Sequence, residues 1–337
     1  MNVLLIQLKR IGDLILTVPA IAAVRTHFPN ANLTLVVAHG SREMLPAIPD
    51  VDRALIARGR VTDAPQWFAL ATAKFDYCLD FSRTDRSAFL TLLSNATKRI
   101  TYRTIRREPL RRLSYNEFVP SRVRDLHTID HHLALLEPLG IHDAWDKIHL
   151  NLPDSAKDQA DRAIAAHHLG ENFAVIHPGS ARIEKFWIAE RWVLVAEQLR
   201  RRGMQVVLTG GKSRLEQDHL ADIKSHLQGT IVDLSGKLGL LAVAALIERA
   251  RILATVDSAP MHLAAALGIP QVVLFGPTNP FHWRPRGAPA VVLRAGQEQP
   301  MTSFVPKQTP HPMKEISTKQ VIDGMESLLS APAARAS

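Results

Sequence analysis

Residues 251–277 read RILATVDSAPMHLAAALGIPQVVLFGP, and this order predicts a strand, a sharp turn, a short helix and a second strand. The apolar, β-branched start is typical of a buried strand, and Asp257 and Ser258 after it are residue types that favour a helix N-terminus. Gly268 ends the predicted helix. In such a unit the strand carboxyl ends and the helix N-terminus meet at one edge, where unpaired N–H groups favour a phosphate. The stretch therefore predicts either a capped βαβ turn or an anion site with Asp257 and His262 beside it.

The chain has the composition of a globular protein. Hydrophobic residues make up 46% of the sequence and charged residues 22%, which excludes a disordered chain. A length of 337 residues suffices for two domains of ordinary size. The one cysteine, Cys78, excludes an internal disulfide and a cysteine-rich metal site, and its neighbours in DYCLDF indicate an inert core thiol in a reducing compartment. The sequence shows neither a secretory leader nor an apolar run long enough to cross a bilayer, so we expect a cytoplasmic protein.

Positive charge is concentrated in one segment. The net charge of the chain is +9, and residues 98–124 carry nine basic and two acidic side chains, a net +7. The segment is either a solvated basic loop or a patch for an anionic partner, such as nucleic acid, phospholipid headgroups or a phosphorylated glycolipid. Arginine suits phosphate recognition, but aromatic side chains that could stack on bases are sparse and no nucleic-acid-binding motif is present. We therefore expect no nucleic-acid partner.

Strands and helices alternate along the chain, which predicts parallel sheets covered by helices on both faces. We expect domains at 1–150 and 158–315, followed by a closing helix and tail over 316–337 that could pack back toward the first domain. Two doubly wound domains that meet at their strand carboxyl ends would place a ligand crevice between them. The predicted strands are 3–8, 32–38, 53–56, 76–81, 173–177, 205–209, 230–234, 251–256 and 270–276. The predicted helices are 14–28 with a kink at Pro19, 42–47, 64–73, 86–93, 126–137, 189–202, 215–227, 240–249, 261–267 and 317–329.

Three motifs stand at predicted strand ends. They are G-D-x-x-x-T-x-P from Gly12, H-P-G-S from His177 with K-x-W from Lys185, and D-S-A-P-M-H-x-A-A-A-x-G-x-P-x-x-x-L-F-G-P-T from Asp257. Together they resemble glycosyltransferase family 9, the ADP-heptose:lipopolysaccharide heptosyltransferases, over nearly the whole chain. W-R-P at 283–285 and the K-x-W spacing are most similar to the heptosyltransferase III-like members, which add a branching third heptose. The resemblance implies an α/β GT-B fold, in which two Rossmann-like doubly wound domains face each other across a cleft.

The resemblance gives Asp13 the role of general base. From the residues alone, Asp13 is either an acid that stabilises a helix N-terminus or a catalytic carboxylate facing the cleft. As the base it would take the proton of the acceptor hydroxyl while that oxygen attacks the anomeric carbon of the donor. One base and a good leaving group suffice for inverting transfer. Basic residues of the first domain are the candidates for binding a phosphorylated acceptor: Lys9, Arg10, Arg83, Arg86, Arg106, Arg107, Arg111 and Arg112.

The resemblance places the nucleotide-sugar donor on the second domain. Lys185 would neutralise the charge that develops on the leaving ADP, a role that a metal fills in other transferases, so we expect no metal and no cofactor. From the residues alone, Lys185 can be an exposed lysine, Glu216 a helix-surface acid and His262 a structural histidine. The other donor-binding residues that the resemblance implies are Gly12, Ser180, Gly210, Gly211, Leu238, Asp257, Ser258 and Ala259.

These observations lead to an expected function. The chain would be a monomeric inverting transferase that moves heptose from ADP-heptose to the phosphorylated core glycolipid of lipopolysaccharide. It would lie peripherally on the inner face of the inner membrane, against an anionic membrane surface. The alternatives are a GT-B transferase or epimerase that uses another nucleotide sugar, and a non-catalytic nucleotide-sugar-binding protein. Asp13 and Lys185 argue against the non-catalytic alternative, and the lack of a G-x-G-x-x-G motif disfavours a dinucleotide dehydrogenase.

Overall fold

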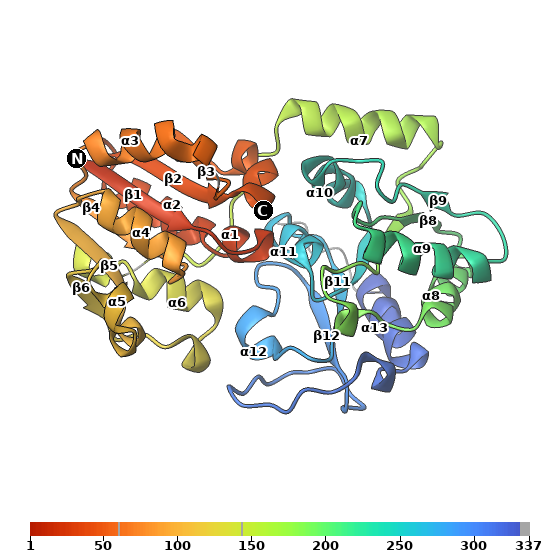
Figure 1. Cartoon of the computed structure of the whole chain (residues 1–337). Helices are drawn as coiled ribbons and strands as arrows, with labels where there is room; N and C mark the ends of the chain where they lie inside the picture. The colour runs from red at the N-terminus through yellow and green to blue at the C-terminus, as the bar shows by residue number, and fades with distance from the viewer. Residues whose placement is uncertain (60, 143, 331–337) are drawn as a thin grey trace. The chain divides into compact units, whose positions relative to one another are not determined.

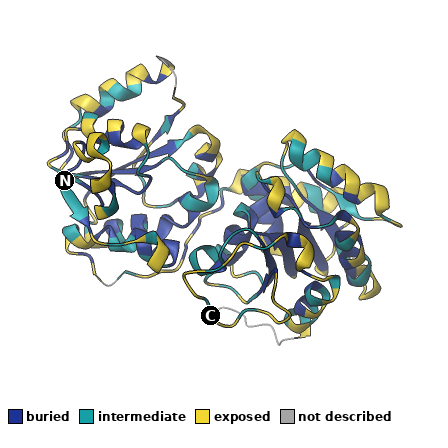
Figure 2. Cartoon of the chain, turned by 60° about the horizontal axis from the view of Figure 1, so that its bottom comes forward, coloured by how far each residue is buried: buried dark blue, intermediate teal, exposed yellow. Residues whose placement is uncertain are grey.

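The computed structural model describes residues 1–59, 61–142 and 144–330 and divides the chain into two compact units (Figure 1). The first unit runs from Met1 to Asn151 and the second begins at Leu152. Each unit contains a six-stranded parallel sheet whose strands alternate with helices, which confirms the predicted doubly wound α/β fold. The central strands of both sheets are buried, and the longer outer helices, such as α7, α8 and α9, expose one face, as Figure 2 shows.

The first unit has the strand order β3-β2-β1-β4-β5-β6. Helix α3 packs against α4 and α4 against α5, whereas α2 packs against α6. The first of these helix rows, α3–α4–α5, is used below as one surface. The strands are β1 (Asn2–Gln7), β2 (Asn32–Ala38), β3 (Arg53–Ala57), β4 (Tyr77–Asp80), β5 (Lys98–Tyr102) and β6 (Glu117–Val119). The helices are α1 (Ile11–Ile15), α2 (Val18–His27), α3 (Ala64–Thr72), α4 (Asp85–Leu93), α5 (Pro109–Arg112) and α6 (Thr128–Ala134), with 3-10 turns at η1 (His39–Ala47), η2 (Val61–Asp63), η3 (Arg103–Arg107), η4 (Val123–Asp125) and η5 (Glu137–Leu139).

The second unit repeats this topology with the order β12-β11-β10-β7-β8-β9. Its core contains two fully buried tryptophans, Trp187 and Trp192, whose rings meet edge to face. The strands are β7 (Phe173–His177), β8 (Gln205–Leu208), β9 (Val232–Asp233), β10 (Ile252–Val256), β11 (Gln271–Phe275) and β12 (Ala290–Arg294). The helices are α7 (Asp154–Ala166), α8 (Ala189–Arg201), α9 (Arg214–His226), α10 (Leu240–Arg249), α11 (Ala259–Ala266), α12 (Pro280–Trp283) and α13 (Thr318–Ser330), with 3-10 turns at η6 (Ile183–Lys185) and η7 (Met313–Glu315).

The closing helix α13 belongs to the second unit. It packs against α8, β11 and β12, and its side chains Val321 and Met325 lie in the hydrophobic core of that unit. The sequence analysis allowed this helix to pack back toward the first domain. In the structure, the apolar face of α13 is instead buried in the core of the second unit. Residues 331–337 of the predicted tail lie outside the described residues.

Several predicted elements differ from the structure. The single helix predicted over 14–28 is wrong, because the chain forms α1 and α2 with a break at Leu16 and Thr17. Pro19 causes no kink, since it stands in the first turn of α2, where its missing N–H costs no hydrogen bond. The helix predicted over 42–47 is a 3-10 helix that contains Pro46. Helix α7, whose start lies at the predicted linker, was not predicted, and neither were β5, β6, α5, α12 and β12.

Each sheet reverses its winding direction at one point. In the first sheet β1 lies between β2 and β4, and in the second sheet β7 lies between β8 and β10. In open parallel sheets, ligands bind outside the strand carboxyl ends at such a switch point. The residues after β1 and β4, and those after β7 and β10, are therefore where chemistry is expected. None of the helices in the described ranges is long and apolar enough to cross a membrane.

Candidate functional site

A buried ion pair spans the switch point of the second sheet. Lys185, in the loop after β7, donates from Nζ to Asp257 Oδ2 at 2.5 Å and to the Asp257 carbonyl oxygen at 3.0 Å. Thr278 Oγ1 also donates to Asp257 Oδ2, at 2.7 Å. The side chains of Lys185 and Asp257 are only 10% and 9% exposed. Lys185 is thus not an exposed lysine, and it holds a positive charge at the edge where the motif predicted an anion.

Helix α11 begins beside this pair. Ser258 is its N-cap residue, but the Ser258 side chain makes no capping hydrogen bond; its Oγ lies 3.3 Å from Thr255 Oγ1. Ala259 is the first residue of the helix. The N–H groups of the first helical turn have no partner within a helix and are suited to bind an anion. Ser258 and Ala259 thus stand at a helix N-terminus next to Lys185, and their binding of a diphosphate stays a prediction.

His262 lies one turn into α11 and is buried. Burial lowers its pKa to about 4, so the imidazole is neutral at physiological pH. Its Nδ1 is buried and has no hydrogen-bond partner among the described residues. His177, at the end of β7, is neutral for the same reason, with its pKa lowered to about 4 by burial, but its Nδ1 lies 3.0 Å from Thr209 Oγ1. The Nδ1 of His177 is thus engaged by Thr209, whereas the Nδ1 of His262 is open to a ligand.

Glu216 reaches the carboxyl ends of β7 and β8. Its carboxylate accepts hydrogen bonds from the Gly211 N–H at 3.2 Å and from Ser213 Oγ at 2.9 Å. A Cβ atom on either Gly179 or Gly211 would collide with this carboxylate, so both glycines are needed for it to lie there. Glu216 also stands three residues after the N-cap Ser213 of α9, so its contacts fit both the predicted ribose contact and a structural role at this helix end.

The loops after β8 and β9 continue the same edge. The Gly236 N–H donates to the Gly210 carbonyl oxygen at 2.9 Å, which joins the two loops. Gly210 also packs under Leu220, where a Cβ atom would meet Leu220 Cδ1 at 2.5 Å. Leu238, the predicted adenine contact, follows in the second loop and is half-buried, and Ser180 after β7 is buried. The structure therefore brings the predicted donor-binding residues of the second unit to one edge of its sheet.

In the first unit, Gly12 and Asp13 lie in α1, directly after β1. Thr17 ties down the backbone of this turn: its Oγ1 donates to the Asp13 carbonyl oxygen at 2.7 Å and accepts from Gln7 Nε2 at 2.8 Å. His132 Nδ1, from α6, lies 3.1 Å from Thr17 Oγ1. Burial is the main cause that lowers the pKa of His132 to about 3, so its ring is a neutral hydrogen-bonding group. Sequence reasoning did not identify Gln7 or His132; Gln7, a polar residue at the end of an apolar strand, carries a usable signal, whereas His132 within α6 carries none.

Lys9 and Arg83 bring positive charge to this switch point. Burial lowers the pKa of Lys9, the nearby Arg83 lowers it further, and Asp13 and Asp80 oppose the shift. Arg83 has a left-handed backbone with φ of 58°, which is uncommon for a residue with a side chain. Its Nη1 donates to Thr104 Oγ1 at 2.5 Å. Lys9 and Arg83, two of the predicted acceptor-binding residues, thus share one electrostatic environment with Asp13.

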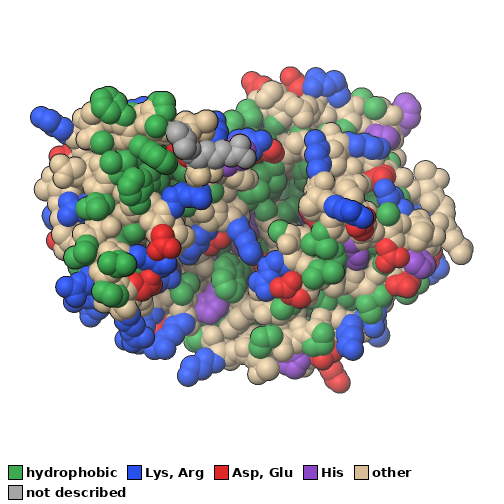
Figure 3. All heavy atoms as spheres, in the orientation of Figure 1, with side chains coloured by type: hydrophobic (Ala, Val, Ile, Leu, Met, Phe, Trp, Pro, Cys, Tyr) green, Lys and Arg blue, Asp and Glu red, His purple; other side chains and the backbone are tan. Residues whose placement is uncertain are grey.

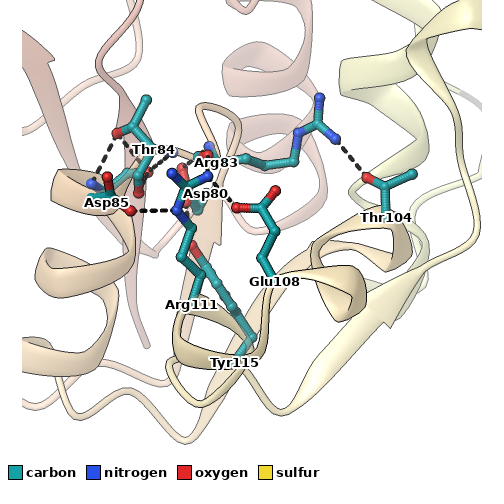
Figure 4. Close-up of polar contacts among 9 residues, drawn as sticks. Asp80, Arg83, Thr84, Asp85, Thr104, Glu108, Arg111 and Tyr115 are labelled. Atoms are coloured by element: carbon teal, nitrogen blue, oxygen red, sulfur yellow. Dashed lines mark hydrogen bonds and ion pairs between the residues drawn. The ribbon is translucent and has the colours of Figure 1, made fainter.

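Asp80 organises the loop that carries Arg83 (Figure 4). It is fully buried and accepts from the N–H groups of Ser82 and Arg83 and from the Tyr115 hydroxyl, the last at 2.6 Å. Burial raises the pKa of Asp80 above its usual value, and these hydrogen bonds partly offset the shift. Sequence reasoning missed Asp80, whose signal is an acid at the end of an apolar strand.

Within the basic segment, Arg111 has a structural role. It forms ion pairs with Asp85 at the start of α4 and with Glu108 before α5, as Figure 4 shows. Arg106 lies over the Phe118 ring, 4.5 Å from its centroid. Arg10 and Arg86 are exposed, as are Arg107 and Arg112 on η3 and α5. The predicted acceptor-binding residues therefore fall into two groups: Lys9, Arg10 and Arg83 follow β1 and β4 at the switch point, and the others lie on α4, η3 and α5.

The described part of the chain contains no group of three or more histidine, cysteine, aspartate or glutamate side chains that could hold a metal ion. Cys78 is buried, and burial raises its pKa to about 12, which agrees with an inert thiol.

Comparisons with known proteins show which family and fold the chain is similar to. The family model described as glycosyltransferase family 9 (heptosyltransferase) matches residues 67–314. Lipopolysaccharide heptosyltransferase 3 of Escherichia coli strain K12 is 28% identical over 339 residues, which cover 96% of this chain and 97% of that protein. A solved family 9 glycosyltransferase from Veillonella parvula is 26% identical with a TM-score of 0.84, covering 97% of each chain. E. coli heptosyltransferase WaaC, solved with ADP-2-deoxy-2-fluoro heptose, shares the fold at 20% identity and a TM-score of 0.71, covering 97% of this chain and 99% of that one.

Proposed function

The chain belongs to glycosyltransferase family 9, and on that basis we propose that it transfers heptose from ADP-heptose to the inner core of lipopolysaccharide with inversion at the anomeric carbon. The relative from E. coli K12 bears the name lipopolysaccharide heptosyltransferase 3, and the two proteins align over almost their full lengths. A structure of the same fold contains an analogue of ADP-heptose. The proposal extends the donor and acceptor class of these proteins to this chain.

The buried Lys185–Asp257 pair is the observation that carries the proposal. Cleavage of a nucleotide sugar leaves negative charge on the departing diphosphate, and a fixed cation stabilises that charge most effectively where water is excluded. Lys185 is nine-tenths buried and lies next to the N-terminus of α11, so cation and helix dipole act on the same anion. Asp257 keeps the ammonium group in place before the donor binds, and its carboxylate is oriented by Thr278.

Asp13 acts as the general base in this proposal. The acceptor hydroxyl loses its proton to the Asp13 carboxylate as the oxygen forms a bond to the anomeric carbon, and the bond from that carbon to the ADP oxygen breaks on the opposite side. The Thr17 hydroxyl fixes the Asp13 backbone through its hydrogen bond to the Asp13 carbonyl oxygen. A base held in this way needs no partner carboxylate, in contrast to the paired acids of glycosidases.

The transfer should proceed without a metal ion. We expect ADP release from ADP-heptose, with heptose-deficient lipopolysaccharide core as acceptor, at the same rate before and after treatment with EDTA, because Lys185 supplies the charge near the diphosphate. The absence of ADP release under both conditions would contradict the proposed function. Loss of activity with EDTA and recovery with magnesium would contradict only the metal-free mechanism.

The exposed arginines of the basic segment should bind the phosphates of the acceptor. Replacing Arg106, Arg107 and Arg112 by alanine is expected to raise the acceptor KM about a hundredfold and to leave ADP affinity unchanged, since each basic residue near an anionic surface contributes roughly 1 kcal/mol. Arg111 is excluded from this variant because its ion pairs with Asp85 and Glu108 hold α4 and α5 together.

A matched control removes the same charge from the second unit. Arg201, Arg202 and Arg214 are exposed side chains of that unit, and their replacement by alanine should leave the acceptor KM within about twofold. Steady-state kinetics at low and high salt distinguish the two variants, because the effect of the basic segment should fade as salt shortens the Debye length. Equal KM values for both variants would assign the segment to ordinary solvated surface.

A further inference from the structure

Exposed apolar side chains gather on one helix row of the first unit. Their exposed fractions lie between 49% and 84%, and they are distributed over α3, α4 and α5 and the residue after it: Phe68, Phe89, Leu92, Leu110 and Leu113. The half-buried Trp67 extends the group, since its ring meets that of Phe89 edge to face at 5.8 Å. Figure 3 shows apolar side chains over the part of the surface where Figure 1 places α3 and α4, and a smaller group near α5. Apolar clusters of this kind on a globular protein mark an interaction surface.

Positive charge borders these apolar side chains. The exposed arginines of α4, η3 and α5 are Arg86, Arg103, Arg106, Arg107 and Arg112. The acidic residues at the junction of α4 and α5, Asp85 and Glu108, share the single charge of Arg111, so these three side chains together are only weakly negative and do not cancel the exposed arginines. The face therefore combines large apolar side chains with a net positive border, and Figure 3 shows the basic side chains along its lower margin.

We propose that the α3–α4–α5 row is a membrane-docking face, in which Leu110 and Leu113 enter the headgroup region of an anionic bilayer and the arginines bind lipid phosphates. Surface binding of this type depends on buried apolar area together with electrostatic attraction to anionic lipid. The inference rests on the proposed function, because a lipid-linked acceptor lies in such a surface. The docking face adds an apolar contribution to membrane affinity, which the arginines of the basic segment alone do not provide.

Charge complementarity favours a bilayer over a second copy of this chain. Two copies that met through this row would bring together two faces on which exposed arginines outnumber the acids, which is unfavourable. An anionic lipid surface supplies the opposite charge and also accepts leucine and phenylalanine side chains. Self-association through this row is therefore the outcome that would overturn the proposal.

The first test measures vesicle binding of the full chain. Vesicles of phosphatidylglycerol and phosphatidylethanolamine should bind the protein, and a part of this binding should persist at high salt, where electrostatic attraction is screened. The double variant Leu110→Ser, Leu113→Ser should lose about tenfold or more in vesicle affinity, most clearly at high salt. The control Leu194→Ser, Val305→Ser removes two exposed apolar side chains of the second unit and should bind as the wild type does. Equal binding by both double variants would overturn the proposal.

The second test locates the contact without relying on affinity. Cys78 is buried, so a thiol introduced at the surface can be labelled selectively with an environment-sensitive fluorophore. The label on a Leu113→Cys variant should shift to shorter wavelength with anionic vesicles, and the label on a Leu194→Cys variant should not. No shift at either position, or a shift that appears with protein concentration in the absence of lipid, would contradict membrane docking and, in the second case, indicate self-association.

These outcomes are distinguishable from failure of the proposed function. Neither vesicle test uses a donor or an acceptor, so vesicle binding without any sugar transfer would contradict the transferase proposal alone. Sugar transfer to a detergent-solubilised acceptor by a protein that ignores anionic vesicles would contradict the docking face alone.

Discussion

Replacing Lys185 by alanine is expected to lower kcat/KM for the nucleotide-sugar donor by about a hundredfold to a thousandfold. A cation that meets developing charge in a site closed to water typically contributes ~2–4 kcal/mol to transition-state stabilisation. The variant would also leave the carboxylate of Asp257 without its cation, so that a buried negative charge would repel the diphosphate. We expect both weaker ADP binding, measured by calorimetry, and slower turnover with saturating donor.

A control separates this effect from simple loss of an ion pair. Lys224 and Asp233 form a more exposed ion pair at 3.0 Å in the same unit. The Lys224→Ala variant should retain kcat/KM within about twofold, because exposed ion pairs contribute little. A Lys185→Ala enzyme with a wild-type melting curve and a kcat/KM within threefold of wild type would show that Lys185 does not meet the leaving group.

Replacing Asp13 by asparagine should lower kcat by a hundredfold or more while donor affinity stays nearly unchanged. The amide has the shape of the carboxylate but cannot take a proton, and loss of a general base costs about 10²–10⁴ in rate. The fold of α1 should survive, since Thr17 binds the backbone oxygen of residue 13 and not its side chain. Single-turnover kinetics with ADP-heptose and acceptor measure the chemical step directly.

The matched control for this variant is Asp154→Asn, an exposed acid in the first turn of α7, which should reduce kcat by no more than a few-fold. A turnover of the Asp13→Asn variant within a few-fold of wild type would assign Asp13 to helix stabilisation, the alternative that the residues alone left open.

The sequence predicted the buried framework better than the surface. The strand over 173–177 and the helix over 240–249 have the predicted bounds, because each is an apolar segment with a clear end. Helix α7 was missed since it buries only Ala156 and Ala160, so its pattern contains few strong apolar signals. Strand β5 was missed because it begins with the charged residues Lys98 and Arg99, and β6 was missed because it has only three residues.

The composition of the site was predictable, but its contacts were not. The motifs identified Lys185 and Asp257 separately, whereas their pairing depends on β7 and β10 being neighbours in the sheet, which periodicity does not determine. In the same way, the place of Glu216 beside Gly179 and Gly211 follows from the adjacency of β7 and β8. The network of Asp80 and Tyr115 joins residues 35 positions apart across two crossovers and has no motif.

The central claim is that this chain transfers heptose from ADP-heptose to the lipopolysaccharide core. The most direct measurement incubates the wild-type protein and heptose-deficient core with ADP-heptose, UDP-sugars and GDP-sugars in separate reactions, and follows nucleotide release together with the mass and anomeric configuration of the product. We predict release of ADP alone, an acceptor extended by one heptose, and an inverted anomeric centre. Release of UDP or GDP with transfer of another sugar, or conversion of the donor sugar without an extended acceptor, would contradict the account.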